Sequence, residues 1–532
     1  MKPTHLRIGV LITMLFFAAG ALLIQLYRVA HDEQAITAST KQGRYSLELP
    51  LSEGAVYDRN FARLTQPLHT WYAIVNPTAD ATAALYTKLI DRTAFQDAVK
   101  DGAPFCCRVT DNAVSNPNVQ ILEGYCAENG LQTAQHLIGY RQNGAGVCGL
   151  QAACADILMA YDCSANATFS VDAYGNVLAG MEQNTKVQGN PHGGIVTTLD
   201  KQFQQITELT LKNADPNPAA AIVMDVHTGE ILAMASRPLY DTAHLAEAMK
   251  RTDAPFLNRA LCSYSVGSVF KLVTTAAALE SGFSTGYMYE CSGQTSVHGQ
   301  VFRCHHAAGH GLLDMRAALV NSCNPYFINL SKILCADALH HTAEQLGFGQ
   351  PIALADGLAA SAGYLQTVSE LEIEAEKANF SFGQGKLLAS PLQIAAMTAC
   401  IANGGVYISP WVLRGETVDG ETLISYPSPE ARQVLQPQNA EAIQDMMVAV
   451  LTEGEHANGI PKNMTAGGKT STAQTGQFSE DGTEYCHAWM TGFFPADAPQ
   501  YAVTVFVERG GSGNTAAAPI FREIIERISA LN

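Results

Sequence analysis

The segment Gly267-Ser268-Val269-Phe270-Lys271 places a serine three residues before a lysine, at the start of an apolar run that continues to Glu280. Residues i and i+3 share one face of a helix, so we expect Ser268 and Lys271 to lie together. A seryl hydroxyl is a weak nucleophile near neutral pH and needs a base beside it. A lysine can be that base when burial and a helix N-terminus lower its pKa. By itself the pair is weak evidence, because a serine near an N-cap followed by a solvated lysine is a common arrangement.

Two later segments supply further polar groups. Asn321-Ser322-Cys323-Asn324-Pro325 puts a hydroxyl and an amide on a short loop before a proline. Gly467-Gly468-Lys469-Thr470-Ser471-Thr472-Ala473-Gln474 puts a cation and hydroxyls on a predicted strand, where its two glycines permit close backbone approach. In chain order the three segments are Ser-x-x-Lys, Ser-x-Asn and Lys-Thr-x, which are the motifs of serine penicillin-binding proteins and class A β-lactamases.

Residues 197–532 resemble the class B penicillin-binding proteins, the monofunctional transpeptidases, well beyond those motifs. The segments that resemble the family are residues 221–225, 228–236, 381–385, 390–395 and 492–496. Before residue 197 the likeness is restricted to the membrane anchor and to residues 54–59. That short segment is similar to the family's Arg-Gly-x-Ile-x-Asp-Arg, with Glu53 in place of the first arginine.

The resemblance implies a role for each polar group of the first two motifs. Ser268 would be the acylated nucleophile and Lys271 its base. Ser322 would relay a proton towards the leaving amine, while Asn324 would hold the peptide of the donor stem. The acyl donor would be a peptidoglycan stem ending in D-Ala-D-Ala, and β-lactams would inhibit by acylating Ser268.

On the third motif the resemblance implies that Lys469 tunes the field around Ser322. Thr470 would bind the terminal carboxylate of the substrate, and the backbone N–H groups of Ser268 and Thr472 would form the oxyanion hole. Ser471 departs from the family, which usually has glycine there, and its hydroxymethyl is expected to narrow the cleft or contact substrate.

A second group of reactive side chains comprises Cys291, Cys304, His305, His306 and His310. The cysteine spacing differs from the C-x₂₋₄-C of structural zinc sites. We therefore interpret the stretch as a structural loop, with or without a Cys291–Cys304 disulfide, and expect neither a metal nor a cofactor. The alternating glutamates at positions 370, 372, 374 and 376 are interpreted as a solvated face.

The elements that must position these groups follow an α+β pattern. Apolar runs predict two strand hairpins, and amphipathic runs predict flanking helices, at residues 199–212, 219–225, 230–235, 488–494, 501–507 and 519–531. We expect an antiparallel sheet flanked by helices, which the resemblance identifies as the penicillin-binding protein transpeptidase or β-lactamase-like fold. Residues 28–196 alternate short apolar runs with turns and are predicted to form a mixed, strand-rich pedestal and dimerisation domain.

The chain has an uncharged stretch from Ile8 to Tyr27, preceded by Lys2 and Arg7 and followed by Arg28. Twenty residues at about 1.5 Å each span a hydrocarbon core of about 30 Å. The stretch exceeds the apolar region of a cleaved signal peptide, which is about 7–15 residues. We predict a cytoplasmic tail at 1–7, a single-pass plasma-membrane anchor at 8–27, and a catalytic domain at 197–532 outside the cytoplasm.

Composition excludes some classes of function. The 532 residues are 47% hydrophobic and 15% charged, which is typical of a modular globular protein. A net charge of −17, without a basic run, makes nucleic acid an unsuitable partner. Thirteen cysteines leave at least one unpaired if all share one compartment, and their pairing stays open.

The predicted function is therefore a peptidoglycan D,D-transpeptidase, with D-Ala-D-Ala carboxypeptidase side activity and a role in cell shape or division. The alternatives on the same fold are a β-lactamase and a β-lactam-sensing protein. Residues after Ser322 contain no Glu-x-x-Leu-Asn segment of a class A β-lactamase, and a receptor would need several membrane spans and a cytoplasmic output domain. Family analogy suggests a SEDS-family glycosyltransferase as the partner that polymerises glycan.

Overall fold

The structure, a computed structural model, describes residues 3–30, 43–127, 132–172, 177–178, 184–216, 218–454 and 457–531. The chain divides into two compact units. The first comprises Met1–Glu53, Leu68–Cys126 and Asp162–Pro191, and the second comprises Gly54–Pro67, Ala127–Tyr161 and His192–Asn532. Residues 54–67 and 127–161, which the sequence pattern assigned to the pedestal, thus have most of their contacts in the second unit.

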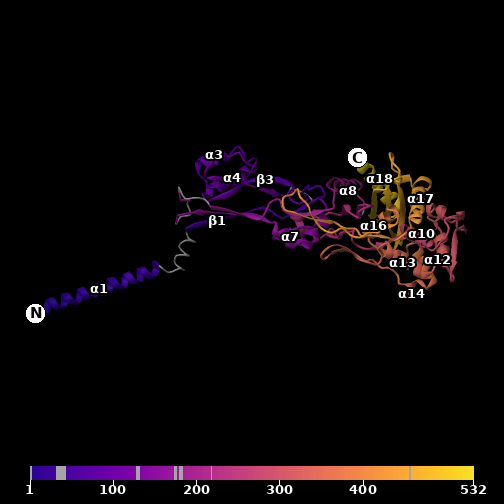
Figure 1. The fold of residues 1–532 in the computed structure, drawn as a ribbon, viewed down its shortest axis with the longest axis horizontal. Coiled ribbons are helices and arrows are strands. Elements are labelled where there is room, and N and C mark those ends of the chain that lie inside the picture. Colours follow the sequence, from indigo (N-terminus) through magenta and orange to yellow (C-terminus); the bar gives the residue numbers. More distant parts are fainter. Residues whose placement is uncertain are drawn as a thin grey trace. The chain divides into compact units, whose positions relative to one another are not determined.

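Helix α1 (Pro3–Ala30) contains the predicted anchor (Figure 1). Its segment Arg7–Arg28 has 22 residues, a mean hydropathy of 2.3 and no buried side chains. A helix of that length extends about 33 Å, which is enough to cross a hydrocarbon core. Among the described residues, α1 is the only helix long and apolar enough to do so.

The first unit also contains two three-stranded antiparallel sheets. One has the order β1 (Arg44–Ser52), β8 (Cys163–Ser170), β9 (Asn184–Gln188), and the other β4 (Phe105–Val109), β3 (Leu68–Val75), β5 (Val119–Cys126). Helices α3 (Ala79–Leu85) and α4 (Arg92–Asp101) contribute Leu85 and Phe95 to a core with the second sheet. This mixture of strands and short helices confirms the strand-rich character predicted for the region.

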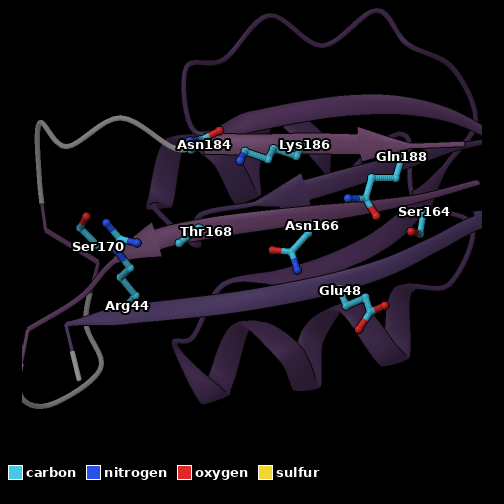
Figure 2. A pocket seen from close by; sticks show the side chains of 9 residues that line it. All are labelled: Arg44, Glu48, Ser164, Asn166, Thr168, Ser170, Asn184, Lys186 and Gln188. Atoms are coloured by element: carbon cyan, nitrogen blue, oxygen red, sulfur yellow. The ribbon is translucent and has the colours of Figure 1, made fainter. Parts of the chain in front are cut away.

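The exposed face of the β1–β8–β9 sheet forms a polar hollow of about 490 Å³ (Figure 2). Because side chains alternate along a strand, β8 buries Cys163, Ala165 and Ala167 on one face and turns its polar residues to the other. The lining side chains belong to Arg44, Glu48, Ser164, Asn166, Thr168, Ser170, Asn184, Lys186 and Gln188. The three charged ones are exposed, so the hollow has no buried ionisable group with which to do chemistry.

The second unit is built on a five-stranded antiparallel sheet. Its order is β12 (Ile231–Arg237), β11 (Ala219–Asp225), β27 (Tyr501–Val507), β26 (Glu484–Phe494) and β25 (Gly467–Phe478). The two predicted hairpins are β11–β12 and β26–β27, and the two strands of each hairpin pair antiparallel with each other. This sheet is the antiparallel core that the apolar runs predicted.

Helices cover both faces of the five-stranded sheet (Figure 1). The odd-numbered residues 219, 221 and 223 of β11 share a core with α8 (Lys201–Ala214) and α18 (Ala518–Ser529). Even-numbered residues 220, 222 and 224 belong to the larger core with α10 (Lys271–Glu280) and α16 (Pro391–Ala402). Both faces are buried, which explains why β11 reads as an uninterrupted apolar run.

A smaller sheet explains the family-like segment at residues 54–59. Strand β2 (Ala55–Tyr57) pairs parallel with β10 (Gly194–Thr197), which pairs with β22 (Leu413–Thr417). Arg59 Nη2 lies 2.8 Å from one carboxylate oxygen of Glu230, and Arg414 Nε lies 3.4 Å from the other. Because Glu230 is 4% exposed, this ion pair fixes the segment to the turn of the β11–β12 hairpin.

Candidate active site

Ser268 lies in a 3₁₀ turn (Gly267–Phe270) that leads directly into helix α10. Gly267 has φ +66° and its N–H donates to the carbonyl of Gly383 at 2.7 Å. A Cβ at Gly383 would lie 2.0 Å from the carbonyl oxygen of Gly267. The two loops therefore touch backbone to backbone, which accounts for the glycine in the family-like segment 381–385 and fixes the turn that presents Ser268.

The amine of Lys271 is surrounded by four oxygen atoms. Its Nζ lies 3.1 Å from Ser268 Oγ and 3.1 Å from Ser322 Oγ. It also lies 2.7 Å from the backbone carbonyl of Ser322 and 2.6 Å from Asn324 Oδ1. The structure thus brings together the first two motifs, from α10 and from the loop before α12 (Asn324–Ile333).

These contacts match the hydrogen-bonding capacity of a neutral amine. The carbonyl of Ser322 and the amide oxygen of Asn324 only accept hydrogen bonds, so they take the two N–H groups that a neutral lysine has. The nitrogen lone pair is then left for a hydroxyl proton, and Ser268 Oγ is within reach of it. The arrangement is the one that a lysine base requires.

Electrostatics favour the same protonation state. Complete burial lowers the pKa of Lys271 well below its usual value, and the nearby charge of Lys469 lowers it further. Burial alone lowers the pKa of Lys469 to about 7. Two ammonium groups in one buried site repel each other, so deprotonation of Lys271 is favoured while Lys469 holds a proton.

Ser322 joins the two lysines. Its Oγ is 3.1 Å from Lys271 Nζ and 3.1 Å from Lys469 Nζ. The residue lies between α11 (Met315–Val320) and α12 and has φ +48°, a backbone conformation that residues other than glycine rarely adopt. Helix α12 begins at Asn324 with Pro325 in its first turn, so Asn324 is the first residue of a helix and not part of the loop that the sequence predicted.

The third motif lies on edge strand β25, as predicted. Lys469 is fully buried, whereas Thr470, Ser471 and Thr472 line a cleft of about 450 Å³ that Ser268 also lines. Thr472 Oγ1 accepts a hydrogen bond from the backbone N–H of Gly513 at 3.3 Å. This places the predicted substrate-binding residues and the predicted nucleophile on one cleft.

Ser471, which was expected to narrow the cleft or contact substrate, lines the cleft, and its hydroxyl also has a partner within the protein. Its Oγ donates to the carbonyl of Val266 at 2.9 Å, and a Cβ on Gly267 would lie 2.3 Å from that oxygen. The hydroxyl therefore ties β25 to the turn that carries Ser268.

The cleft contains six residues that the motifs did not identify: His305, Phe382, Gln384, Gln474, Ser512 and Asn514. Phe382 and Gln384 fall in the family-like segment 381–385, which was a usable signal. Asn514 lies in the π-helical turn Gly513–Ala517 that leads into α18, Ser512 is the residue before that turn, and no motif marked either of them. Of the alternating glutamates, Glu370 and Glu376 lie 3.0 Å and 3.8 Å from Lys386 Nζ, so this face is partly ion-paired.

The five-stranded sheet, its covering helices and the cluster of Ser268 and Ser322 around the buried Lys271 define the class of serine enzymes that use a lysine as base. The chain belongs to the family described as the penicillin-binding protein transpeptidase domain, whose sequence model matches residues 219–526, more than half of the chain. This agrees with the resemblance to class B penicillin-binding proteins.

Two curated relatives show the extent of the similarity. Stage V sporulation protein D of Bacillus subtilis is 33% identical over an alignment of 348 residues, which covers 62% of this chain and about half (52%) of that protein. Peptidoglycan D,D-transpeptidase PbpA of Mycobacterium tuberculosis is 30% identical over an alignment of 367 residues, which covers 63% of this chain and 73% of that protein.

Solved structures show the same fold. Penicillin-binding protein A from M. tuberculosis, in a ceftriaxone acyl-enzyme complex, has a TM-score of 0.64 and 26% identity over 77% of this chain and 93% of its own. A chain from a peptidoglycan synthase complex that coordinates polymerization and crosslinking has a TM-score of 0.69 and 23% identity over 99% of both chains. The second likeness concerns the fold alone.

Proposed function

We propose that this protein is a membrane-anchored peptidoglycan D,D-transpeptidase whose nucleophile is Ser268. The observation that carries the proposal is Lys271 Nζ, which has two acceptor-only oxygens at 2.6 and 2.7 Å and lies 3.1 Å from Ser268 Oγ. The relatives named above include a peptidoglycan D,D-transpeptidase and a protein acylated by a β-lactam.

The first half-reaction forms the acyl-enzyme. Neutral Lys271 takes the proton of Ser268 as Oγ attacks the carbonyl of the penultimate D-alanine, and a C–O bond forms. The oxyanion is held by the backbone N–H groups of Ser268 and Thr472. Ser322 then passes a proton to the departing nitrogen and is reprotonated through the lysines, so the C–N bond breaks and D-alanine leaves.

The second half-reaction reverses the proton path. An amine of a neighbouring stem attacks the ester on Ser268, loses a proton to the Ser322–Lys271 network, and the new amide leaves Ser268 with its proton restored. Thr470 supplies a hydroxyl for the terminal carboxylate of the donor, Asn324 holds its peptide, and the buried Lys469 tunes the field around Ser322, which it contacts at 3.1 Å. The steps need no cofactor.

The location of the chemistry follows from the anchor. We propose that α1 crosses the plasma membrane once, with residues 1–7 in the cytoplasm and the catalytic unit outside, because the cationic Lys2 and Arg7 precede the apolar segment. A SEDS-family glycosyltransferase would supply the glycan strands. The fold likeness to a chain of a peptidoglycan synthase complex supports such a partner.

Fluorescent penicillin tests the proposal on the full chain in detergent. Wild type should form a stable covalent adduct, Ser268→Ala should form none, and mass spectrometry should place the adduct on the peptide containing Ser268. Ser292→Ala is the control, because Ser292 is exposed and does not line the cleft. Labelling of the Ser268→Ala variant would refute the assignment, and rapid loss of label from wild type would favour a β-lactamase. D-Alanine release from a D-Ala-D-Ala stem in the presence of an acceptor amine then tests transpeptidation.

A further inference from the structure

Four metal-ligand side chains meet in the second unit, behind the Ser322 loop. They are Cys291 at the end of β14 (Tyr289–Cys291), Cys304 after β16 (Gln300–Arg303), His310 before β17 (Gly311–Leu313), and Cys323 before α12. Their sulfur and imidazole nitrogen atoms all lie within 4.8 Å of one another. The three cysteines are buried and His310 is partly buried. The sequence had grouped Cys291, Cys304 and His310 in one loop, but it gave no reason to add Cys323.

The separations fit one tetrahedral ion. Ligands at about 2.3 Å from a zinc ion in tetrahedral geometry are about 3.8 Å from one another. Cys304 Sγ lies 3.4 Å from His310 Nδ1, so that ring nitrogen faces the cluster. A set of three thiols and one imidazole selects zinc and similar thiophilic ions over magnesium or calcium, which prefer oxygen.

Backbone groups are placed as in a built metal site. The backbone of His306 lies beside the sulfur of Cys304, and the backbone of Tyr326 lies beside the sulfur of Cys323, where each favours the thiolate. Such backbone groups orient and stabilise ligating thiolates. Both come from residues just after the cysteine, so the local chain wraps the sulfur atom.

Two glycines let the ligand-bearing segments close on each other. A Cβ on Gly309 would lie 2.2 Å from the carbonyl oxygen of Cys291, and one on Gly293 would lie 2.2 Å from that of Ala307. The N–H of Cys304 donates to the carbonyl of Gly293 at 2.9 Å, and Cys291 pairs with Gly311 in the β14–β17 ladder. The four ligands are therefore held by backbone contacts that do not depend on their own side chains.

The competing interpretation is a buried thiol cluster or a disulfide. All thirteen cysteines lie in the described residues and none is in a disulfide. A bridge between any two of the three cysteines would leave the third thiol and the imidazole facing it. A single divalent ion uses all four groups, so it explains more of the arrangement than a disulfide does.

We propose that Cys291, Cys304, His310 and Cys323 bind one Zn²⁺, and that this ion fixes the loop carrying Ser322 and Asn324. Cys323 lies between those two residues, so a bond from its sulfur to the ion limits the movement of the chain on both sides. The ligands are positioning residues, because none of them touches Ser268 or either lysine. The zinc site itself does not rest on the proposed transpeptidase function, whereas its positioning role does.

Metal content of the full chain purified in detergent without added metal tests the site. We expect about one zinc per chain by elemental mass spectrometry in wild type and in Cys335→Ser, since Cys335 is an exposed cysteine at the start of α13 (Ala336–Gln345). Cys304→Ser and His310→Ala should lose most of the zinc. Less than about a tenth of an equivalent in folded wild type, or a disulfide among Cys291, Cys304 and Cys323 found by peptide mapping, would refute the proposal.

Cobalt gives a readout on wild type alone, in case the variants fail to fold. Replacement of zinc by Co²⁺ should produce thiolate charge-transfer absorption and the intense d–d bands of a tetrahedral site, whereas an adventitious surface site would show weak six-coordinate bands. For the positioning role, chelation should slow penicillin acylation at saturating drug rather than weaken initial binding, and added Zn²⁺ should restore the rate. Full acylation by the metal-free folded protein would show that the ion does not fix the loop.

Discussion

Replacing Asn324 by aspartate changes the charge beside Lys271 and keeps the shape of the side chain. Asn324 Oδ1 lies 2.6 Å from Lys271 Nζ, and Lys271 is completely buried. A carboxylate at that distance attracts an ammonium by up to about 6 kcal/mol at an effective dielectric constant of about 20. The interaction favours protonated Lys271, so it removes the neutral amine on which acylation depends.

Even a third of that energy is a large effect. About 2 kcal/mol raises the ratio of protonated to neutral lysine about 30-fold. We therefore expect Asn324→Asp to lower the second-order rate constant of penicillin acylation at least about 30-fold at neutral pH. Asn321→Asp is the matched control: Asn321 is exposed and its amide donates to the carbonyl of Ala317. A solvent-screened charge there should change the rate by less than about twofold.

The pH dependence of the acylation rate distinguishes two explanations for a slower Asn324→Asp variant, which are protonation of Lys271 and the loss of a contact between Asn324 and substrate. The assay is stopped-flow acylation by fluorescent penicillin, with the rate of the variant divided by that of wild type at each pH. The ratio should rise with pH, approaching about tenfold per unit, because the raised pKa of Lys271 in the variant is overcome as protons are removed. A ratio that stays constant with pH would refute the reasoning, since it would mean that Asn324 acts only through contacts with substrate.

Three further changes test other parts of the site. Burial lowers the pKa of Lys469 to about 7, so its charge is present below that pH and lost above it. Acylation by a carboxylate-bearing β-lactam should therefore decline above about pH 7. A decline that persists in Lys469→Met would contradict this assignment. Ser471→Gly removes the hydrogen bond to the buried carbonyl of Val266 and should cost about 1–3 kcal/mol of unfolding free energy, which an unchanged denaturant midpoint would disprove. Glu230→Gln breaks the ion pair with Arg59 and Arg414 and should lower the free energy of unfolding by about 1–3 kcal/mol. The loss is smaller than for a fully buried pair because both arginines are partly exposed. Calorimetry should show the loss of stability, while a slower acylation rate per folded molecule would argue against a purely structural role.

The sequence was sufficient to predict which side chains meet around Lys271 because each motif is local. Ser268 and Lys271 are one helical turn apart, and Ser322 and Asn324 are two residues apart at the start of α12, so spacing alone put each pair close together. The hairpins β11–β12 and β26–β27 were predictable for the same reason, since their strands are neighbours in the chain. What spacing does not give is the convergence of Lys469 and Lys271 on Ser322 Oγ, which depends on how the sheet edge packs against α10.

Contacts between segments that lie far apart in the chain explain which features could not be predicted from the sequence. Strand β2 pairs with β10 although more than a hundred residues separate them, so the pattern of residues 54–67 gave no sign that they belong with the catalytic unit. The Cys291, Cys304 and His310 group was interpreted as a plain loop because its spacing is unlike a zinc finger. Its fourth member, Cys323, was hidden inside a motif that already had a different interpretation.

The backbone of Ser322 connects these observations. A serine at φ +48° costs of order 1–3 kcal/mol relative to an ordinary conformation, so such a residue persists only when its surroundings hold it. Glycine would relieve the strain, but it would remove the hydroxyl that lies 3.1 Å from both lysines. Two contacts of Ser322 itself oppose relaxation: Lys271 donates to its carbonyl, and Lys469 donates to its hydroxyl. Both contacts change when substrate or a proton arrives, whereas the packing of Cys323 among Cys291, Cys304 and His310 does not. A constraint outside the proton path therefore allows Ser322 to exchange protons without losing its position.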